Sequence, residues 1–143
     1  MGRPYFAYAS NMDTAQMAER CPGATLVDGA VVAAMTFVIT SQGYANIVPD
    51  ANRVVFGILW DITPGDEASL DRYEGIRPGL YRKEEMEVLT TGGAPVRALI
   101  YRASATKTGL PAPGYLEATI AAARAHGLPA DYVRHLETWL RTH

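Results

Sequence analysis

The sequence of 143 residues is poor in cysteine, in net charge and in long apolar runs, and each deficiency excludes a class of protein. The single cysteine, Cys21, cannot form an internal disulfide, which is typical of a reducing compartment and makes the cytoplasm the expected location. No apolar run approaches the roughly 18 residues that a membrane span needs. The net charge of −2 offers no basic surface to nucleic acid. We therefore expect neither a membrane nor a nucleic-acid partner.

Several catalytic and metal-binding patterns are also missing. The three histidines, His126, His135 and His143, all lie near the C-terminal end, at positions typical of helix surfaces. No spacing of histidine, cysteine or carboxylate residues matches a metal site. The sequence contains neither the Gly-x-Ser-x-Gly turn of serine hydrolases nor a glycine-rich phosphate loop before a helix. A histidine-dependent hydrolase is thus disfavoured, and we expect no metal and no cofactor.

The amino-acid composition is that of a globular protein. Apolar residues make up 48% of the chain and charged residues 20%, which predicts one domain over residues 1–143. Residue patterns predict strands at 3–8, 30–40, 45–48, 53–62, 80–90 and 96–102, and helices at 14–20, 63–74, 114–126 and 130–141. Pro49 is expected to end the third strand, and the strand at 80–90 to be exposed or at an edge. The order indicates the α+β class, with a sheet or small barrel followed by two helices.

The segment Tyr5–Met12 combines an aromatic strand with a polar bend. Tyr5, Phe6 and Tyr8 are typical of a strand, whereas the following Ala-Ser-Asn is not. The bend offers backbone N–H groups, a hydroxyl and a carboxamide, which suit an anionic or carbonyl oxygen of a ligand. Core packing is the alternative role for the three aromatic rings.

Glu74 is the carboxylate whose position draws attention, because it closes a predicted helix just before Gly75. The helix dipole disfavours an acid there, and burial would raise its pKa into the range useful for proton transfer. A solvated glutamate at a helix end fits the same position. Asp71 is a second candidate on nearly the same face, and it can instead pair with Arg72 or Lys83. Position alone leaves these alternatives open.

Five groups of segments match, in order, the motifs of a known enzyme family. They are Tyr5–Met12, Ala45–Val48, Val55–Trp60, Leu70–Gly75 with Tyr81, and Pro111–Tyr115 with Gly127–Tyr132. On these segments the chain resembles the γ-glutamylcyclotransferases with a Tyr-Gly-Ser-Asn signature, within the AIG2-like superfamily. The resemblance implies a small mixed β-barrel with flanking helices. It also implies the cleavage of a γ-glutamyl amide by the substrate's own α-amine, which releases 5-oxoproline and the free amine or amino acid.

The resemblance further implies where the small γ-glutamyl substrate binds. Glu74 takes the catalytic role of moving protons, backbone groups of residues 5–10 hold the glutamyl unit, and Ser10 and Asn11 help place its α-carboxylate or γ-carbonyl. The implied substrate-binding residues are Tyr5, Phe6, Ala7, Tyr8, Ala9, Ser10, Asn11, Tyr81 and Tyr115.

Ala9 departs from the family signature, which has glycine at this position. If the position requires a positive φ, alanine is strained there; if the glycine serves only close approach of the substrate, the extra methyl group narrows the pocket. Two other functions stay open: a binding or regulatory module that keeps the fold without turnover, and a γ-glutamyl amidohydrolase that uses water. The sequence also leaves the oligomeric state open, a homodimer included.

Overall fold

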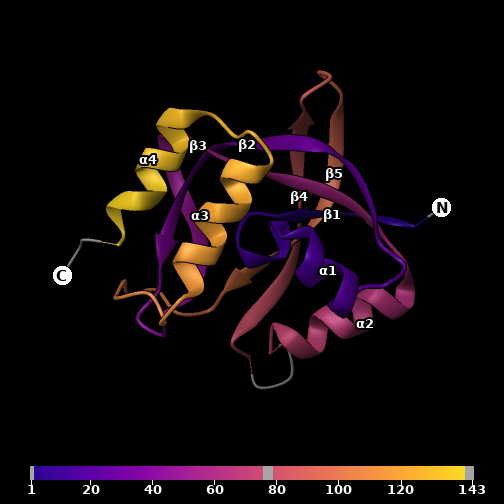
Figure 1. Cartoon of the computed structure of the whole chain (residues 1–143), viewed down its shortest axis with the longest axis horizontal. Coiled ribbons are helices and arrows are strands. Elements are labelled where there is room, and N and C mark those ends of the chain that lie inside the picture. Colours follow the sequence, from indigo (N-terminus) through magenta and orange to yellow (C-terminus); the bar gives the residue numbers. More distant parts are fainter. Residues whose placement is uncertain (1, 76–78, 141–143) are drawn as a thin grey trace.

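The computed structural model of the chain describes residues 2–75 and 79–140. Its elements are β1 (Arg3–Ala7), the 3₁₀ turn η1 (Ser10–Met12), α1 (Thr14–Arg20), β2 (Thr25–Ile39), β3 (Ala45–Ile62), α2 (Pro64–Tyr73), β4 (Tyr81–Thr90), β5 (Pro95–Ala103), α3 (Tyr115–Ala125) and α4 (Ala130–Thr138). Figure 1 shows α3 and α4 side by side on one flank of the strands, and α1 with α2 on another. The predicted α+β class is confirmed.

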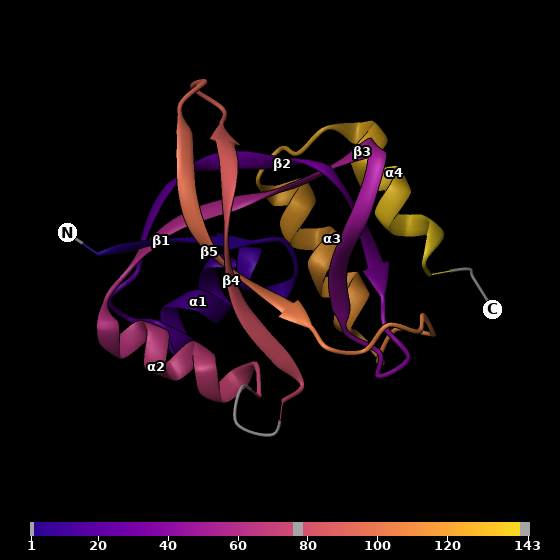
Figure 2. The same cartoon turned by 180° about the vertical axis from the view of Figure 1, so that it is seen from behind.

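The five strands close into a barrel in the order β1-β3-β2-β4-β5. Neighbouring strands are antiparallel except β1 and β5, which run parallel and meet at the pair Tyr5 and Leu99. The small mixed barrel implied by the family resemblance is therefore confirmed, and Figure 2 shows its other side. The strand at 80–90 was expected to be exposed or at an edge: most residues of β4 are exposed or half-buried, but closure of the barrel gives the strand a partner on each side, β2 and β5.

β3 is one long strand, whereas the sequence predicted two strands separated at Pro49. Pro49 lies opposite Met35, next to a register shift in β2 between Ala33 and Met35. Ala34, at that shift, has a left-handed φ of 59°. Proline is tolerated at such a bulge because the regular hydrogen-bond ladder is already interrupted there. The strand therefore runs through Pro49, and the β2–β3 hairpin curves around the barrel (Figure 1).

The barrel strands and the last two helices share one apolar core. Among its fully buried side chains are Phe6, Phe37, Ile39, Ile47, Leu59, Leu99, Ile100 and Leu116. Val133 and Leu136 of α4 are buried, whereas the helix predicted at 130–141 ends at Thr138 and Leu140 beyond it is exposed. Within the part of the chain that the structure describes, no helix has the length and apolar character to cross a membrane.

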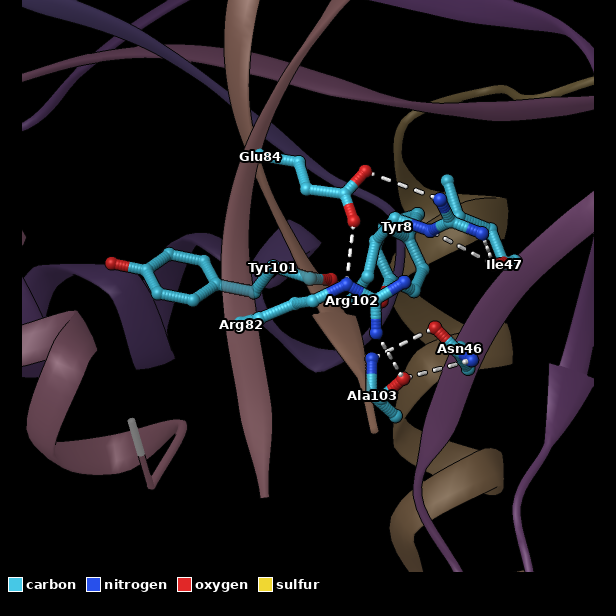
Figure 3. A network of polar contacts seen from close by, with 8 residues as sticks. All are labelled: Tyr8, Asn46, Ile47, Arg82, Glu84, Tyr101, Arg102 and Ala103. Atoms are coloured by element: carbon cyan, nitrogen blue, oxygen red, sulfur yellow. Dashed lines mark hydrogen bonds and ion pairs between the residues drawn. The ribbon is translucent and has the colours of Figure 1, made fainter. Parts of the chain in front are cut away.

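Side chains join the start of β3 to the end of β5, two strands that are not neighbours in the barrel order (Figure 3). Asn46 Oδ1 accepts a hydrogen bond from the Ala103 N–H at 2.9 Å. Arg102 donates to the Ile47 carbonyl at 3.0 Å and pairs with Glu84 at 3.1 Å. This seam holds the two strand ends together next to the candidate site.

Candidate active site

A small cavity lies where the end of β1, the end of α2 and the start of α3 come together. Its volume is about 30 Å³, which exceeds the space that one water molecule needs. The residues that line it are Tyr5, Phe6, Tyr8, Ala9, Ser10, Asn11, Ala45, Glu74, Tyr81, Tyr101 and Tyr115. These include every residue that the sequence predicted for the site except Ala7, which is buried in β1 opposite Ile58. Tyr101 and Ala45 are additions that sequence reasoning missed.

Helix α2 places Glu74 at the cavity through signals that are local in the sequence. The Thr63 side chain accepts from the Asp66 N–H, and the Asp66 carboxylate accepts from the Thr63 N–H, so the helix start is fixed as predicted. At the other end the Glu74 N–H donates to the Leu70 carbonyl at 2.8 Å. Gly75 then takes a φ of +68°, which glycine adopts without strain and which ends the helix.

Glu74 has the electrostatic properties of a proton-transfer group. Burial raises the pKa of its carboxyl from 4.5 to about 7, although the positive charge of Arg20 acts in the opposite direction. The residue as a whole is half-buried. Within the described residues, 2–75 and 79–140, no group donates a hydrogen bond to its carboxylate. A carboxylate with this pKa exchanges a proton readily near neutral pH.

Asp71, the second candidate carboxylate, is already engaged. Its Oδ1 accepts from the Tyr101 hydroxyl at 2.6 Å. Lys83 Nζ lies 3.2 Å from the same carboxylate. Of the two pairings predicted for Asp71, with Arg72 or with Lys83, the structure has the one with Lys83. Of the two carboxylates, Glu74 is therefore the one to which no described residue donates a hydrogen bond.

Two tyrosine hydroxyls of the cavity accept a hydrogen bond from the protein and keep their own proton for a ligand. Tyr5 Oη accepts from Asn11 Nδ2 at 2.9 Å, and Tyr115 Oη accepts from the Ala45 N–H at 3.2 Å. Neither hydroxyl donates to another residue of the described part of the chain. Burial raises the pKa of both phenols, so they stay protonated at neutral pH and act as donors.

Two other hydroxyls are oriented the opposite way. Tyr8 donates to the Tyr101 carbonyl at 2.6 Å, and Tyr81 donates to the Ala45 carbonyl. Because each proton is used inside the protein, the oxygens present lone pairs. The cavity thus combines the donor hydroxyls of Tyr5 and Tyr115, the acceptor hydroxyls of Tyr8 and Tyr81 and the carboxylate of Glu74. This pattern is complementary to a ligand that carries both an ammonium group and carbonyl or carboxylate oxygens.

The polar bend after β1 contains Ala9, which stands where the family signature has glycine. Ala9 has a φ of −133°, so the position does not require a left-handed conformation. Ala9 lines the cavity, so the alternative in which its methyl group narrows the pocket stays a prediction. Ser10 also lines the cavity, and its Oγ accepts from Gln16 Nε2 at 3.0 Å. A direct role of Ser10 in binding stays a prediction.

The remaining reactive residues of the described chain do not line the cavity. Cys21 is buried, and burial raises the pKa of its thiol to about 11. His126 and His135 are half-buried rather than on open helix surface: a His126 ring nitrogen lies 2.6 Å from the Met12 carbonyl oxygen. His143 lies outside the described residues. Among the described residues, no three His, Cys, Asp or Glu side chains are grouped as metal ligands would be.

A comparison with protein families identifies the family of the chain. The model of the AIG2-like family matches residues 54–136, which is more than half of the chain. The chain belongs to the AIG2-like family. Its resemblance to the γ-glutamylcyclotransferases, which the sequence motifs indicated, is confirmed by the relatives that follow.

Two curated relatives of this AIG2-like protein and one solved structure are named γ-glutamylcyclotransferase. It is 28% identical to the γ-glutamylcyclotransferase of Bos taurus over 146 residues, which covers 94% of this chain and 77% of the bovine protein. Identity with the Homo sapiens enzyme is 29% over 145 residues, 93% of this chain and 76% of the relative. A solved γ-glutamyl cyclotransferase superposes with a TM-score of 0.88 at 26% identity, covering 96% of this chain and 87% of that one. YkqA of Bacillus subtilis shares the fold. It is 20% identical and superposes with a TM-score of 0.84, which covers 98% of this chain and 54% of the YkqA chain.

Proposed function

We propose that the protein is a γ-glutamylcyclotransferase that converts a γ-glutamyl amide into 5-oxoproline and a free amine or amino acid. The observation that carries the proposal is Glu74, a carboxylate without a partner among the described residues and with a pKa of about 7, at a cavity lined by tyrosines. The named relatives support the same reaction. The leaving group is the part of the substrate that the proposal leaves open.

The reaction moves two protons from the α-nitrogen of the substrate to the leaving nitrogen, and Glu74 mediates the first of these moves. Its carboxylate takes a proton from the α-ammonium group, and the freed amine attacks the γ-carbonyl carbon. A carbon–nitrogen bond forms within the glutamyl unit, and Glu74 gives its proton to the leaving nitrogen as the original amide bond breaks. The new ring nitrogen then loses its remaining excess proton, which the released amine takes up to become an ammonium ion. Because the attack is intramolecular, orientation in the cavity supplies much of the rate. No water, metal or cofactor enters this balance.

The tyrosines supply the orientation. The acceptor hydroxyls of Tyr8 and Tyr81 face the α-ammonium group together with Glu74, and the donor hydroxyls of Tyr5 and Tyr115 face substrate oxygens. In this arrangement the amine is held beside its base. A cytoplasmic location fits the single buried cysteine, and it belongs to the proposal as well.

Incubation with γ-glutamyl amino acids and γ-glutamyl amines, with 5-oxoproline and free glutamate measured separately, tests the proposal. We expect 5-oxoproline from the wild type and a loss of at least about 10²-fold in Glu74→Gln. Asp71→Asn should retain far more activity, and Glu117→Gln, which changes an exposed glutamate of α3, should retain all of it.

Each other result has a defined meaning. Glutamate without 5-oxoproline identifies an amidohydrolase that uses water. Binding of the γ-glutamyl amide without either product identifies a binding module. An active Glu74→Gln variant overturns the assignment of the base.

A further inference from the structure

The orientation of the Asn11 side chain is fixed by Arg20. Arg20 NH1 lies 3.0 Å from Asn11 Oδ1, and Gln16 Nε2 lies 3.0 Å from the same oxygen. A guanidinium group has hydrogen-bond donors and no acceptor, so the Asn11 atom that faces it must be the carbonyl oxygen. The amide nitrogen of Asn11 therefore points the other way, toward Tyr5.

Tyr5 receives its orientation from this amide nitrogen. Asn11 Nδ2 lies 2.9 Å from Tyr5 Oη, and an amide nitrogen donates but does not accept. The Tyr5 oxygen must accept this bond, and its own O–H is directed elsewhere. Because Tyr5 lines the cavity that also contains Glu74, this proton is available to a ligand.

The chain of contacts is held rigidly. Asn11 is only 4% exposed, and its backbone carbonyl accepts from Trp60 Nε1 at 3.2 Å. The Arg20 guanidinium lies over the ring of Tyr73, 4.2 Å from its centroid. Neither side chain can turn without losing several contacts at once, so the amide keeps one orientation.

We propose that Arg20 and Asn11 are positioning residues that make the Tyr5 hydroxyl a dedicated hydrogen-bond donor to the γ-carbonyl oxygen of the substrate. The inference rests on the proposed cyclotransferase function. During ring closure the γ-carbonyl oxygen gains negative charge, and a neutral donor fixed in advance stabilises that charge more than the uncharged ground state. Asn11 thus acts through Tyr5, and Tyr5 is the residue that touches the reacting group.

Asn11→Asp isolates the direction of this hydrogen bond with almost no change of shape. The new carboxylate only accepts, so Tyr5 must donate to it and its proton turns away from the substrate. Arg20 and Gln16 can still donate to the other oxygen, which favours retention of the fold. We expect kcat to fall about 10²-fold, which is the range seen when an oxyanion donor is removed, with a much smaller change in KM.

A double-mutant cycle with Tyr5→Phe separates this role from a general structural one. Tyr5→Phe alone should lower kcat by a similar factor, and the double variant should be no worse than Asn11→Asp, because the hydroxyl has already been turned away. Arg20→Lys, which still presents only donors, should keep most of the activity, whereas Arg20→Met should lose it. Thermal unfolding of each variant checks that the fold is intact.

The pH profile distinguishes proton direction from simple electrostatics. The negative charge that Asn11→Asp adds, or the loss of the Arg20 charge, moves the acidic limb of the profile by raising the pKa of Glu74. A change of charge alone leaves kcat on the alkaline plateau of the profile at its wild-type value. The inference requires a lower kcat on this plateau in Asn11→Asp.

The outcomes that overturn the inference are separate from those that overturn the function. Failure of the wild type to release 5-oxoproline refutes the proposed function and the inference with it. An active wild type combined with a full plateau in Asn11→Asp refutes the inference alone. So does a Tyr5→Phe loss that is as large in the Asn11→Asp background as in the wild type.

Discussion

A glutamine at position 74 should abolish activity and yet stabilise the fold above neutral pH. Burial raises the pKa of Glu74 from 4.5 to about 7. Between these two values the folded chain holds a proton that the unfolded chain releases. The free energy of unfolding therefore decreases as the pH rises toward 7, and this loss is complete once Glu74 is ionised in the folded state. Glutamine carries no charge and avoids the loss.

The magnitude follows from the difference between the two pKa values. One pKa unit corresponds to about 1.4 kcal/mol, so ionisation of buried Glu74 costs the wild type up to about 3 kcal/mol. At pH 5 the group is still mostly protonated in the folded chain, and the cost is below about 1 kcal/mol. We expect the stability of Glu74→Gln, relative to the wild type, to increase by about 2–3 kcal/mol between pH 5 and pH 8.

Urea unfolding at the two pH values measures this increase, because the other titrating groups are common to both proteins and cancel. Glu117→Gln, an exposed glutamate at the start of α3, is the matched control and should show no increase with pH. A stability difference between Glu74→Gln and the wild type that is the same at pH 5 and pH 8 would mean that Glu74 is solvated in the folded protein. The reasoning that makes it a base at neutral pH would then be refuted.

Gly75→Ala should lower the free energy of unfolding by roughly 1–2 kcal/mol in urea titrations, because φ is +68° and the added Cβ would lie 2.9 Å from Leu80 Cδ1. Ala9→Gly should lower it by about 0.5–1 kcal/mol, since a φ of −133° needs no glycine; a gain in stability would contradict this. Asn46→Ala should cost roughly 1–3 kcal/mol by thermal unfolding, because the Ala103 N–H loses its partner.

Helix ends could be predicted because their signals are local. The Thr63-Pro64 start of α2 has both halves of its capping box in the structure, and the Asp13 side chain caps α1 by accepting from the Gln16 N–H. Each cap joins residues only three positions apart, so the sequence contains everything that the cap needs.

Strand bounds were less predictable because they depend on distant partners. β2 begins at Thr25 rather than residue 30, although Asp28 and Gly29 are poor strand formers, because this stretch pairs with the end of β3. Pairing overrides local preference in the same way at Pro49, where the bulge opposite makes a proline acceptable.

Most residues that line the cavity could be predicted from the sequence, but the interactions among them could not. The family motifs supplied Glu74 and most of the cavity lining. Tyr101 belongs to the lining only because β5 closes the barrel against β1. The choice between Glu74 and Asp71 likewise depended on distant residues. Tyr101 of β5 and Lys83 of β4 both donate hydrogen bonds to the Asp71 carboxylate. No local pattern contains that information.

The cavity takes its lining from β1, η1, β3, β4, β5, the end of α2 and the start of α3, so no contiguous stretch of the chain contains it. A ligand held there contacts residues between Tyr5 and Tyr115 and binds only the closed barrel. By mass action, each tenfold rise in ligand concentration above the dissociation constant adds about 1.4 kcal/mol to the free energy of unfolding of the whole barrel. Occupancy of the site and cooperative folding are therefore thermodynamically linked in this protein.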